Sequence, residues 1–318
     1  MTSRPIAIYY EHPDWFRPLF AELDSRGVNY VKLDASCHSF DPVAGGADFS
    51  LVFNRMSASA YLRGNGQAIF FTHSYLAYLE TTGVRVLNGS RAFALEISKA
   101  RQLRLFDSLG LRFPKTRVVN CAEEILAAAS QIGFPLLVKP NIGGRGAGIV
   151  RFDSIEQLRT SIGEASLDLG IDQTALVQEF IPARNGHITR VETLGGKFLY
   201  AIDIFTSGQH FNLCPAEICQ VQSASAFIED STGGTPNPPL KVETSKPLPS
   251  IIDAVEKIAA FGGIDVGGVE YMIDDRDGRI VYYDINALSN FVANAPQVLG
   301  FDPHARLVDY LEQQKDRV

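Results

Sequence analysis

The stretch that decides the fold is FPLLVKPNIGGRGAGIVRFDS, which runs from Phe134 to Ser154. An apolar run ends at Lys139, four glycines follow within Gly143–Gly148, and a second apolar run begins at Ile149. Glycine-rich loops bring backbone N–H groups close to phosphate groups. The stretch therefore indicates a candidate phosphate-binding loop, with a flexible hairpin tip that binds nothing as the alternative.

The residues around the glycines decide what kind of loop this is. The sequence contains no GxxxxGK[ST] string, so a Walker loop is excluded. A Rossmann loop would lead directly into a helix, whereas Val150 and Phe152 continue an extended apolar run and the next helix cap comes only at Asp153–Ser154. The loop is therefore predicted to join two strands. It would form a hairpin whose tip covers phosphates and whose first strand ends with Lys139.

A second predicted hairpin, GGVEYMIDDRDGRIVYYDIN at residues 267–286, carries a group of oxygen ligands. Asp284 and Asn286 are two residues apart and point to one face of their strand. Glu270 lies at nearly the same distance from the DRDG turn, so a symmetric hairpin places it opposite Asp284. These oxygens suit Mg²⁺, which binds through few carboxylates, water and substrate phosphates; a solvent-facing polar strand is the alternative. The opposite face is predicted to hold Val269, Tyr271, Ile273, Val281 and Tyr283.

The bulk properties limit the class of protein. A chain of 318 residues suggests roughly two domains or one large composite. The net charge of -7 argues against a nucleic-acid partner, because nucleic-acid-binding surfaces are basic. No run approaches the roughly 20 apolar residues of a membrane span, and the N-terminal residues resemble neither a signal peptide nor a transit peptide. The sequence therefore predicts a cytoplasmic protein with no membrane segment.

The N-terminal part of the chain is predicted to alternate strands and helices. The segment from Trp15 to Leu23 has one apolar face, which is typical of an amphipathic helix, and Gly27 ends it. Strands that alternate with helices favour a parallel sheet. The predicted strands are Ile6–Tyr10, Asn29–Leu33 and Phe49–Asn54.

Four further elements are predicted along the rest of the chain. A single helix covers Arg91–Leu111, and a second helix follows with Asn120 as its N-cap candidate and two acids in its first turn. Ile188–Leu194 and Phe198–Phe205 form a hairpin around GGK. Residues 206–250 are rich in Ser, Thr, Gly and Pro and are predicted to form a loop.

The order of these motifs resembles that of the ATP-grasp superfamily. Lys99 comes first, then LLVKP with its glycine loop, VQEFI, Arg190 and the Glu…Asp-x-Asn set. The resemblance covers the chain from about Val86 to Ala295 and is greatest to the RimK-type branch, which includes a ligase that adds glutamate to a ribosomal protein and related amino-acid ligases. It implies the ATP-grasp fold, of the α/β (α+β) class, preceded by a Rossmann-like domain. The implied domains are residues 1–90, residues 91–185 with the glycine loop, and residues 186–318 with the metal ligands.

The resemblance also implies a role for each motif residue. Arg190 and Lys139 would be catalytic, with Arg190 beside the transferred phosphoryl group. Mg²⁺, or Mn²⁺ in its place, would be held by Glu270, Asp284 and Asn286. The residues implied to bind ATP are Lys99 and Lys139 at the phosphates, Gly143, Gly144, Arg145, Gly146, Ala147 and Gly148 above them, and Gln178, Glu179, Phe180 and Ile181 around the adenine, mainly through the backbone of Glu179 and Ile181.

Two departures from the family pattern matter. Family members usually carry a ribose-binding carboxylate shortly after the adenine hinge, whereas this chain reads GHITRV there, with His187 or Thr189 as candidates. After the metal-binding asparagine the family often reads Ser-Pro-Gly, whereas this chain reads ALSNF. Because the second change lies on the acceptor side, the substrate is not transferable from relatives.

Together these residues predict an ADP-forming ligase that joins a carboxylate to an amine through an acyl phosphate. Such a reaction requires positioning and charge neutralisation, which lysines, arginines, metal ions and loop amides supply. The partners would be a small acid and an amine, such as an amino acid or a small peptide, and a homo-oligomer is left open. The candidate substrate-binding residues are Arg55, His210, Asn212, Ser289 and Asn290.

Alternatives remain open at this point. An ATP-grasp small-molecule kinase would use the same nucleotide site, and a regulatory module would bind nucleotide without turnover. Single residues also have alternative interpretations, and for Lys99 the alternative is a lysine on the surface of a helix. Arg190 has the alternative of a cross-strand ion pair with Asp203.

Overall fold

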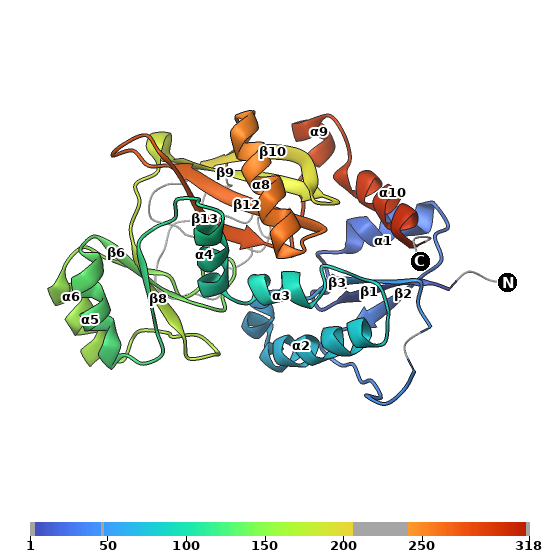
Figure 1. Cartoon of the computed structure of the whole chain (residues 1–318), viewed down its shortest axis with the longest axis horizontal. Coiled ribbons are helices and arrows are strands. Elements are labelled where there is room, and N and C mark those ends of the chain that lie inside the picture. The colour runs from blue at the N-terminus through green and yellow to red at the C-terminus, as the bar shows by residue number, and fades with distance from the viewer. Residues whose placement is uncertain (1–3, 46–47, 206–240, 316–318) are drawn as a thin grey trace, which may run out of the picture.

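The structure is a computed structural model that describes residues 4–45, 48–205 and 241–315. The described residues form three sheets, and helices cover each of them (Figure 1). The fold is of the mixed α/β class expected from the sequence, with one parallel sheet and two antiparallel sheets. None of the helices in these described ranges has the length and apolar character needed to cross a bilayer.

The first sheet is parallel and has the strand order β2-β1-β3-β4. Its two faces are covered by different helices, α1 on one side and α2 on the other (Figure 1). Side chains alternate accordingly, so that Ile6 and Ile8 pack with α1 whereas Ala7 and Tyr9 pack with α2. The elements are β1 (Ile6–Tyr10), α1 (Arg17–Ser25), β2 (Tyr30–Asp34), β3 (Leu51–Arg55), η1 (Ala58–Arg63), α2 (Gly66–Thr81) and β4 (Val86–Leu87).

The second sheet contains the glycine-loop hairpin and is antiparallel, with the order β5-β8-β6-β7. Leu136 pairs with Phe152 across the hairpin, which confirms the prediction that the glycines join two strands. Helices α5 and α6 cover one face of this sheet through the cluster that includes Ile125 and Leu158. The elements are β5 (Thr116–Val119), α5 (Glu123–Ile132), β6 (Leu136–Pro140), β7 (Val150–Phe152), α6 (Ile155–Gly163) and β8 (Ala175–Glu179).

The third sheet is antiparallel, with the order β11-β10-β9-β12-β13, and the other two predicted hairpins lie in it. Helices α4 and α8 pack on one face, and the other face packs toward α1 and α10. The elements are α3 (Ser90–Glu96), α4 (Lys99–Ser108), η2 (Arg184–Gly186), β9 (His187–Leu194), β10 (Lys197–Phe205), β11 (Val242–Thr244), α8 (Pro249–Gly262), β12 (Val266–Ile273), β13 (Ile280–Asn286), α9 (Ala295–Leu299) and α10 (Pro303–Lys315).

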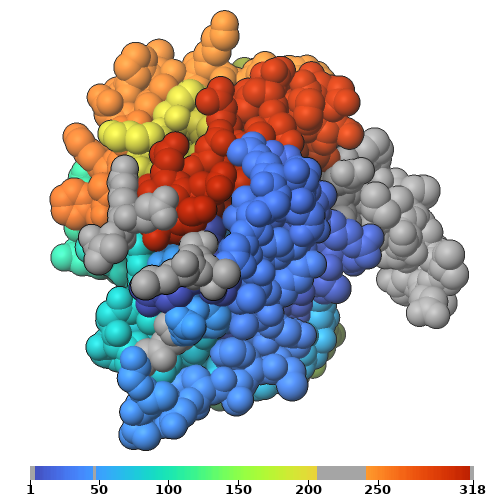
Figure 2. Space-filling model, turned by 90° about the vertical axis from the view of Figure 1, so that its right-hand side faces the viewer, coloured from blue at the N-terminus to red at the C-terminus, as the bar shows by residue number. Residues whose placement is uncertain are grey.

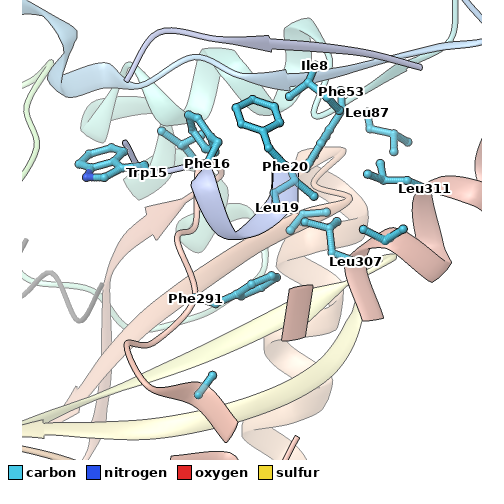
Figure 3. Packing of buried hydrophobic residues seen from close by; sticks show 14 of the residues in the cluster. Ile8, Trp15, Phe16, Leu19, Phe20, Phe53, Leu87, Phe291, Leu307 and Leu311 are labelled. Carbon is cyan, nitrogen blue, oxygen red and sulfur yellow. The ribbon is translucent and has the colours of Figure 1, made fainter. Parts of the chain in front are cut away.

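The N-terminal and C-terminal parts of the chain share one apolar cluster. Phe16 and Leu19 at α1 lie between the parallel sheet and the C-terminal helix, where they pack with Leu307 and Leu311 of α10 (Figure 3). The two regions, blue and red in Figure 2, adjoin on the surface of the molecule. This packing fixes the carboxyl ends of β1 and β3 relative to the third sheet.

The prediction of a single helix over Arg91–Leu111 is wrong. The chain forms two helices, α3 and α4, because Ser98 adopts an extended conformation and caps the second one. Its hydroxyl accepts a hydrogen bond from the Arg101 N–H and donates one to Asn141 Oδ1, 3.2 Å away. The break makes Lys99 the first residue of α4.

Two smaller predictions also differ from the structure. Asn120 does not cap α5, whose N-cap is Ala122 with no side-chain hydrogen bond; Glu123 and Glu124 lie in the first turn, where a helix favours negative charge. The loop predicted for residues 206–250 ends early, because β11 begins at Val242 and α8 at Pro249. Residues 206–240 lie outside the described residues.

Candidate active site

The three sheets enclose a cavity of about 540 Å³. The glycine loop, the segment after β8 and the β12–β13 hairpin supply most of its wall. The remaining wall comes from the carboxyl ends of β1 and β3 in the first sheet and from the region between α3 and α4. Most of the sequence-predicted nucleotide and metal residues therefore face one space, although they are spread over most of the chain.

The glycine loop forms one side of the cavity. Lys139 on β6 is buried and lines it, together with Gly143, Gly144, Arg145, Gly146 and Ala147. Gly148 is not on the wall and shapes the turn, since its φ is +72° and an added Cβ would lie 2.8 Å from Pro140 Cγ. An added Cβ on Gly144 would lie 2.8 Å from Ser59 Cβ, so the loop tip touches the first sheet's domain.

The segment after β8 forms the wall next to the loop. Gln178, Glu179, Phe180 and Ile181 all line the cavity, as predicted for the adenine hinge. The side chain of Gln178 donates to Thr116 Oγ1 at 2.8 Å, and the Glu179 carboxylate accepts from Arg276 Nη2 at 2.7 Å. Since these side chains already have protein partners, the hinge would contact a ligand mainly through its backbone.

The oxygen ligands of the β12–β13 hairpin lie together on the opposite wall. Glu270 pairs directly with Asp284 across the strands, which confirms the predicted register. Asp284 Oδ1 lies 3.0 Å from Lys99 Nζ, and Asn286 Nδ2 donates to Glu270 Oε1 at 3.2 Å. Two carboxylates and an amide oxygen at one cavity wall form a donor set that fits Mg²⁺ or Mn²⁺.

Tyr283 corrects the predicted alternation of this hairpin. The register shifts after Glu270, so that Tyr271 pairs with Tyr282 and Tyr283 is the extra residue of a β-bulge. Its side chain lines the cavity instead of the opposite face, and its hydroxyl donates to Glu270 Oε2 at 2.6 Å. This hydrogen bond orients the Glu270 carboxylate.

Arg190 on β9 connects the carboxylates to the acceptor side of the cavity. Its Nε donates to Glu192 Oε1 at 2.6 Å, Nη1 to Glu270 Oε1 at 3.3 Å and Nη2 to Ser289 Oγ at 2.8 Å. Burial alone would lower the pKa of Arg190, but the two carboxylates outweigh it and hold the pKa above its ordinary value. The alternative ion pair with Asp203 is wrong.

Strand alternation explains why Asp203 is not the partner of Arg190. Adjacent residues of a strand point to opposite faces, so Thr189 rather than Arg190 meets Asp203, with 2.6 Å between Oγ1 and Oδ1. His187 lies on the same face as Thr189, with Nε2 4.0 Å from Asp203 Oδ1 and its ring packed on Phe205. Neither His187 nor Thr189 is among the described residues that line the cavity.

The two lysines differ in their pKa values. Burial, together with the positive charge of Lys99, lowers the pKa of Lys139 to about 8. Burial also acts to lower the pKa of Lys99, but the adjacent Asp284 carboxylate outweighs it and raises the pKa above its usual value. The alternative of Lys99 as a surface lysine is therefore wrong, and both ammonium groups lie at the cavity.

The predicted substrate residues are only partly brought together. Asn290 lines the cavity, and Arg55 lies buried behind it, where Nη2 donates to the Ser289 carbonyl oxygen and to Asn290 Oδ1 at 3.5 Å. Ser289 meets Arg190 through its hydroxyl. His210 and Asn212 lie outside the described residues.

Sequence reasoning missed several wall residues. Trp15 and Glu96 line the cavity, and burial raises the pKa of the Glu96 carboxyl above its ordinary value. Ser57 and Ser59 line it as well. The only signal in the sequence was that these residues follow strands of a predicted parallel sheet, since ligands of open parallel sheets bind beyond the carboxyl ends of the strands. Trp15 follows β1, and both serines follow β3.

Comparison with known proteins agrees with this geometry. Residues 101–188 match the family described as carbamoyl-phosphate synthase L chain, ATP binding domain. The solved structure of the ATP-grasp ligase PsnB with a minimal precursor matches with a TM-score of 0.67, at 20% identity, over 99% of this chain and 100% of that one. The chain has the ATP-grasp fold. A RimK domain ATP-grasp protein from Sphaerobacter thermophilus DSM 20745 also matches, with a TM-score of 0.64 at 19% identity over 96% and 99% of the two chains.

Relatives of this ATP-grasp chain include a D-alanine–D-alanine ligase from Xanthomonas axonopodis pv. citri (strain 306). The two are 28% identical over 228 residues, which are 69% of this chain and 66% of that ligase. A carbamoyl phosphate synthase large chain from Gemmatimonas aurantiaca is matched over only 19% of its length. The chain thus spans just under two thirds of the first relative and about a fifth of the second.

Proposed function

We propose that this ATP-grasp chain is an ADP-forming ligase that joins a carboxylic acid to an amine. The observation that carries the proposal is the single cavity with Lys139 and the glycine loop on one wall and Glu270, Asp284 and Asn286 on the other. ATP would lie between them, with its adenine at the segment after β8 and its phosphates beneath the loop. The same reaction class is supported by the relatives and structural neighbours that are named as ligases.

The chain's own residues would neutralise the charge that develops during transfer. Lys99 and Lys139 would contact the phosphates, and Arg190 would face the transferred phosphoryl group. Mg²⁺ or Mn²⁺, held by Glu270, Asp284 and Asn286, would neutralise and orient the phosphate oxygens. Preorganised charges in a cavity with little water are the main source of rate in phosphoryl transfer.

The reaction would proceed in two balanced steps. An oxygen of the acid carboxylate attacks the γ-phosphorus, the bond to the β-phosphate oxygen breaks, and ADP leaves from an acyl phosphate. The amine nitrogen then attacks the acyl carbon, inorganic phosphate leaves, the amine loses a proton, and an amide forms. No described side chain has to become a covalent nucleophile, since ATP provides the activated leaving group.

The experiment that tests the proposal is ADP release across a matrix of acids and amines, with product masses measured. A ligase releases ADP only when an acid is present, forms an amide of the summed mass less water, and releases one inorganic phosphate for each amide. A small-molecule kinase would release ADP with an alcohol and yield a phosphorylated product. Binding of Mg²⁺–ATP with no turnover anywhere in the matrix would favour the regulatory module.

ATP affinity is expected to fall as pH rises through about 8. Lys139 carries its proton below its pKa of about 8 and loses it above. Bound phosphates favour the charged ammonium and raise its pKa, so above about pH 8 binding must take up a proton. The dissociation constant should then rise by up to about tenfold per pH unit, and stay flat below. Calorimetric titration with Mg²⁺–AMP-PNP at pH values below and above 8 measures this dissociation constant.

The control for this pH dependence is Lys139→Arg. Arginine keeps its proton throughout the range, so the variant should bind with a flat profile. A wild-type affinity that is the same at pH 7 and at pH 9.5 would show that Lys139 does not meet the phosphates.

Gly144→Ala is expected to weaken nucleotide binding by about tenfold, since overpacking of this kind costs about 1–3 kcal/mol. The added methyl would lie 2.8 Å from Ser59 Cβ, so the loop tip must move away from the first sheet's domain. Titration with Mg²⁺–AMP-PNP measures the loss. The matched control is Gly163→Ala at the end of α6, where an added Cβ meets nothing within 4 Å, and binding there should not change. Equal affinity in both variants would contradict the loop's role.

A further inference from the structure

The first sheet has a crevice that the proposed nucleotide site does not use. Its strand order is β2-β1-β3-β4, and the chain leaves β1 toward α1 but leaves β3 toward α2, on the other face (Figure 1). The point between β1 and β3 is therefore the topological switch of a parallel sheet, where ligands bind beyond the carboxyl ends of the strands. This end of the sheet faces the cavity, since Trp15, Ser57 and Ser59 are on the wall.

Arg55, the last residue of β3, is a buried charge with no anionic partner within ion-pair distance among the described residues. Its side chain is 3% exposed. Within the described ranges only Nη2 has hydrogen-bond partners, the Ser289 carbonyl and Asn290 Oδ1, whereas Nε and Nη1 make no hydrogen bond there. Burial lowers the pKa of Arg55 to about 10. The Glu96 and Glu192 carboxylates act on this guanidinium only from beyond ion-pair distance. Buried charges in proteins are normally paired at short range, so its unbonded Nε and Nη1 offer a place for a further anion.

His12 and Trp15, which follow β1, supply two more hydrogen-bond donors without partners. Nδ1 of His12 accepts the backbone N–H groups of Asp14 and Trp15 at 3.2 and 3.3 Å, so Nε2 carries the hydrogen of the neutral ring. The two rings stack at 4.1 Å. Their side chains are 1% and 9% exposed, and neither Nε2 of His12 nor Nε1 of Trp15 has a hydrogen-bond partner in the part of the chain that the structure describes.

Trp15 lines the cavity directly, whereas Arg55 lies behind Asn290, which lines it. In Figure 3 the indole nitrogen of Trp15 lies on the side of the ring away from Phe16 and Phe20, which belong to the apolar cluster. Buried donors are almost always satisfied in folded proteins, because an unmade hydrogen bond costs about 1–3 kcal/mol. The unsatisfied groups of Arg55, His12 and Trp15 are all donors. The hydroxyls of Ser57 and Ser59 lie 2.8 Å from each other, and both residues line the same cavity as Trp15.

We infer that this crevice binds a substrate carboxylate other than the one that is phosphorylated. Arg55 supplies the positive charge, and Trp15 and Ser59 supply neutral donors. The carboxylate belongs either to a second acid group of the acid substrate or to the amine substrate, as it would in an amino acid. This inference rests on the proposed function, because it places the reacting carboxylate at Arg190 and the non-reacting one at the first sheet.

The chain carries its own probe of this crevice, because Trp15 is its single tryptophan. The protein, saturated with Mg²⁺–AMP-PNP, is titrated with dicarboxylic acids from malonate to adipate and with their monoamides while indole fluorescence is recorded. Amino acids and their carboxamides form a second series. Charge-assisted hydrogen bonds contribute about 1.5–3 kcal/mol, so in at least one series the carboxylate form should bind about tenfold or more tightly than its amide. The series that responds identifies the source of the carboxylate.

Two variants test which residues are responsible. Arg55→Met should weaken binding of the carboxylate probe by about tenfold to a hundredfold. It should also remove the preference for the carboxylate over its amide, while Mg²⁺–AMP-PNP binds as before. Arg26→Met, which removes an exposed arginine from the same domain, is the matched control and should change neither. Trp15→Phe keeps the stacked ring and loses the N–H. Measured by calorimetry, it should also reduce the preference.

The outcomes separate this inference from the ligase proposal. No carboxylate preference in either series, or an undiminished preference in both Arg55→Met and Trp15→Phe, overturns the inference. Efficient ADP release with acids and amines that carry no second carboxylate also overturns it, yet leaves the ligase intact. A clear preference in binding without ADP release from any combination supports the crevice and rejects the ligase.

Discussion

Asn in place of Asp284 is expected to lower acid-dependent ADP release by about a thousandfold, in line with the loss of one preorganised charge at a transition state. The carboxylate lies opposite Glu270 and 3.0 Å from Lys99 Nζ, at the wall where the phosphates would meet the metal. Asparagine keeps the shape of the side chain but removes the negative charge that both the Lys99 ammonium and the metal ion require. The measurement is ADP release at saturating ATP, together with Mn²⁺ affinity from electron paramagnetic resonance, which should fall as well.

The matched control for this change is Asp309→Asn on α10. Asp309 also pairs with a basic residue, Arg26, but its side chain is half exposed and is not among the described residues that line the cavity. Exposed ion pairs contribute little, so turnover should be unchanged. If the Asp284 variant keeps turnover within tenfold of the wild type, the metal assignment is wrong.

Arg190→Met is expected to destabilise the fold by about 3–5 kcal/mol, which is the usual cost of removing one partner of a buried ion pair. Arg190 is buried between Glu192 and Glu270, and the Oε2 atom of Glu192 already has no hydrogen bond. Without the guanidinium, both buried carboxylates lose the positive charge that pairs with them. Urea unfolding measures the loss. An unfolding free energy within about 1 kcal/mol of wild type would contradict the ion-pair network.

A second substitution separates the two roles of Arg190. In the double variant Arg190→Met, Glu192→Met, the unpaired carboxylate of Glu192 is gone, so much of the lost stability should return. Turnover should remain reduced by about a hundredfold or more, because no cation faces the transferred phosphoryl group. Recovery of both stability and turnover would mean that Arg190 serves only the fold.

The parts of the site that are local in sequence could be predicted from it. The glycines between two apolar runs indicate a hairpin, and the turn-centred spacing in residues 267–286 places Glu270 opposite Asp284. Both conclusions depend on strand periodicity over a few residues, which a sequence displays directly.

The other parts depend on contacts between distant segments. The bulge that turns Tyr283 toward Glu270 shifts one residue and leaves the apolar pattern unchanged, so alternation assigned Tyr283 to the wrong face. The break at Ser98 depends on its hydrogen bond with Asn141, which lies in another sheet's loop. Trp15 reaches the cavity only because the first sheet docks on the third, and no local pattern encodes that docking.

The most direct test of the central claim is a crystal structure of the chain with AMP-PNP and Mn²⁺, with the metal located by its anomalous scattering. We expect the triphosphate between Lys139 and Asp284, the adenine against Ile181, and the manganese peak bonded to oxygens of Asp284 and Asn286. A nucleotide bound elsewhere, or a manganese peak away from these oxygens with the phosphates outside the cavity, would contradict it.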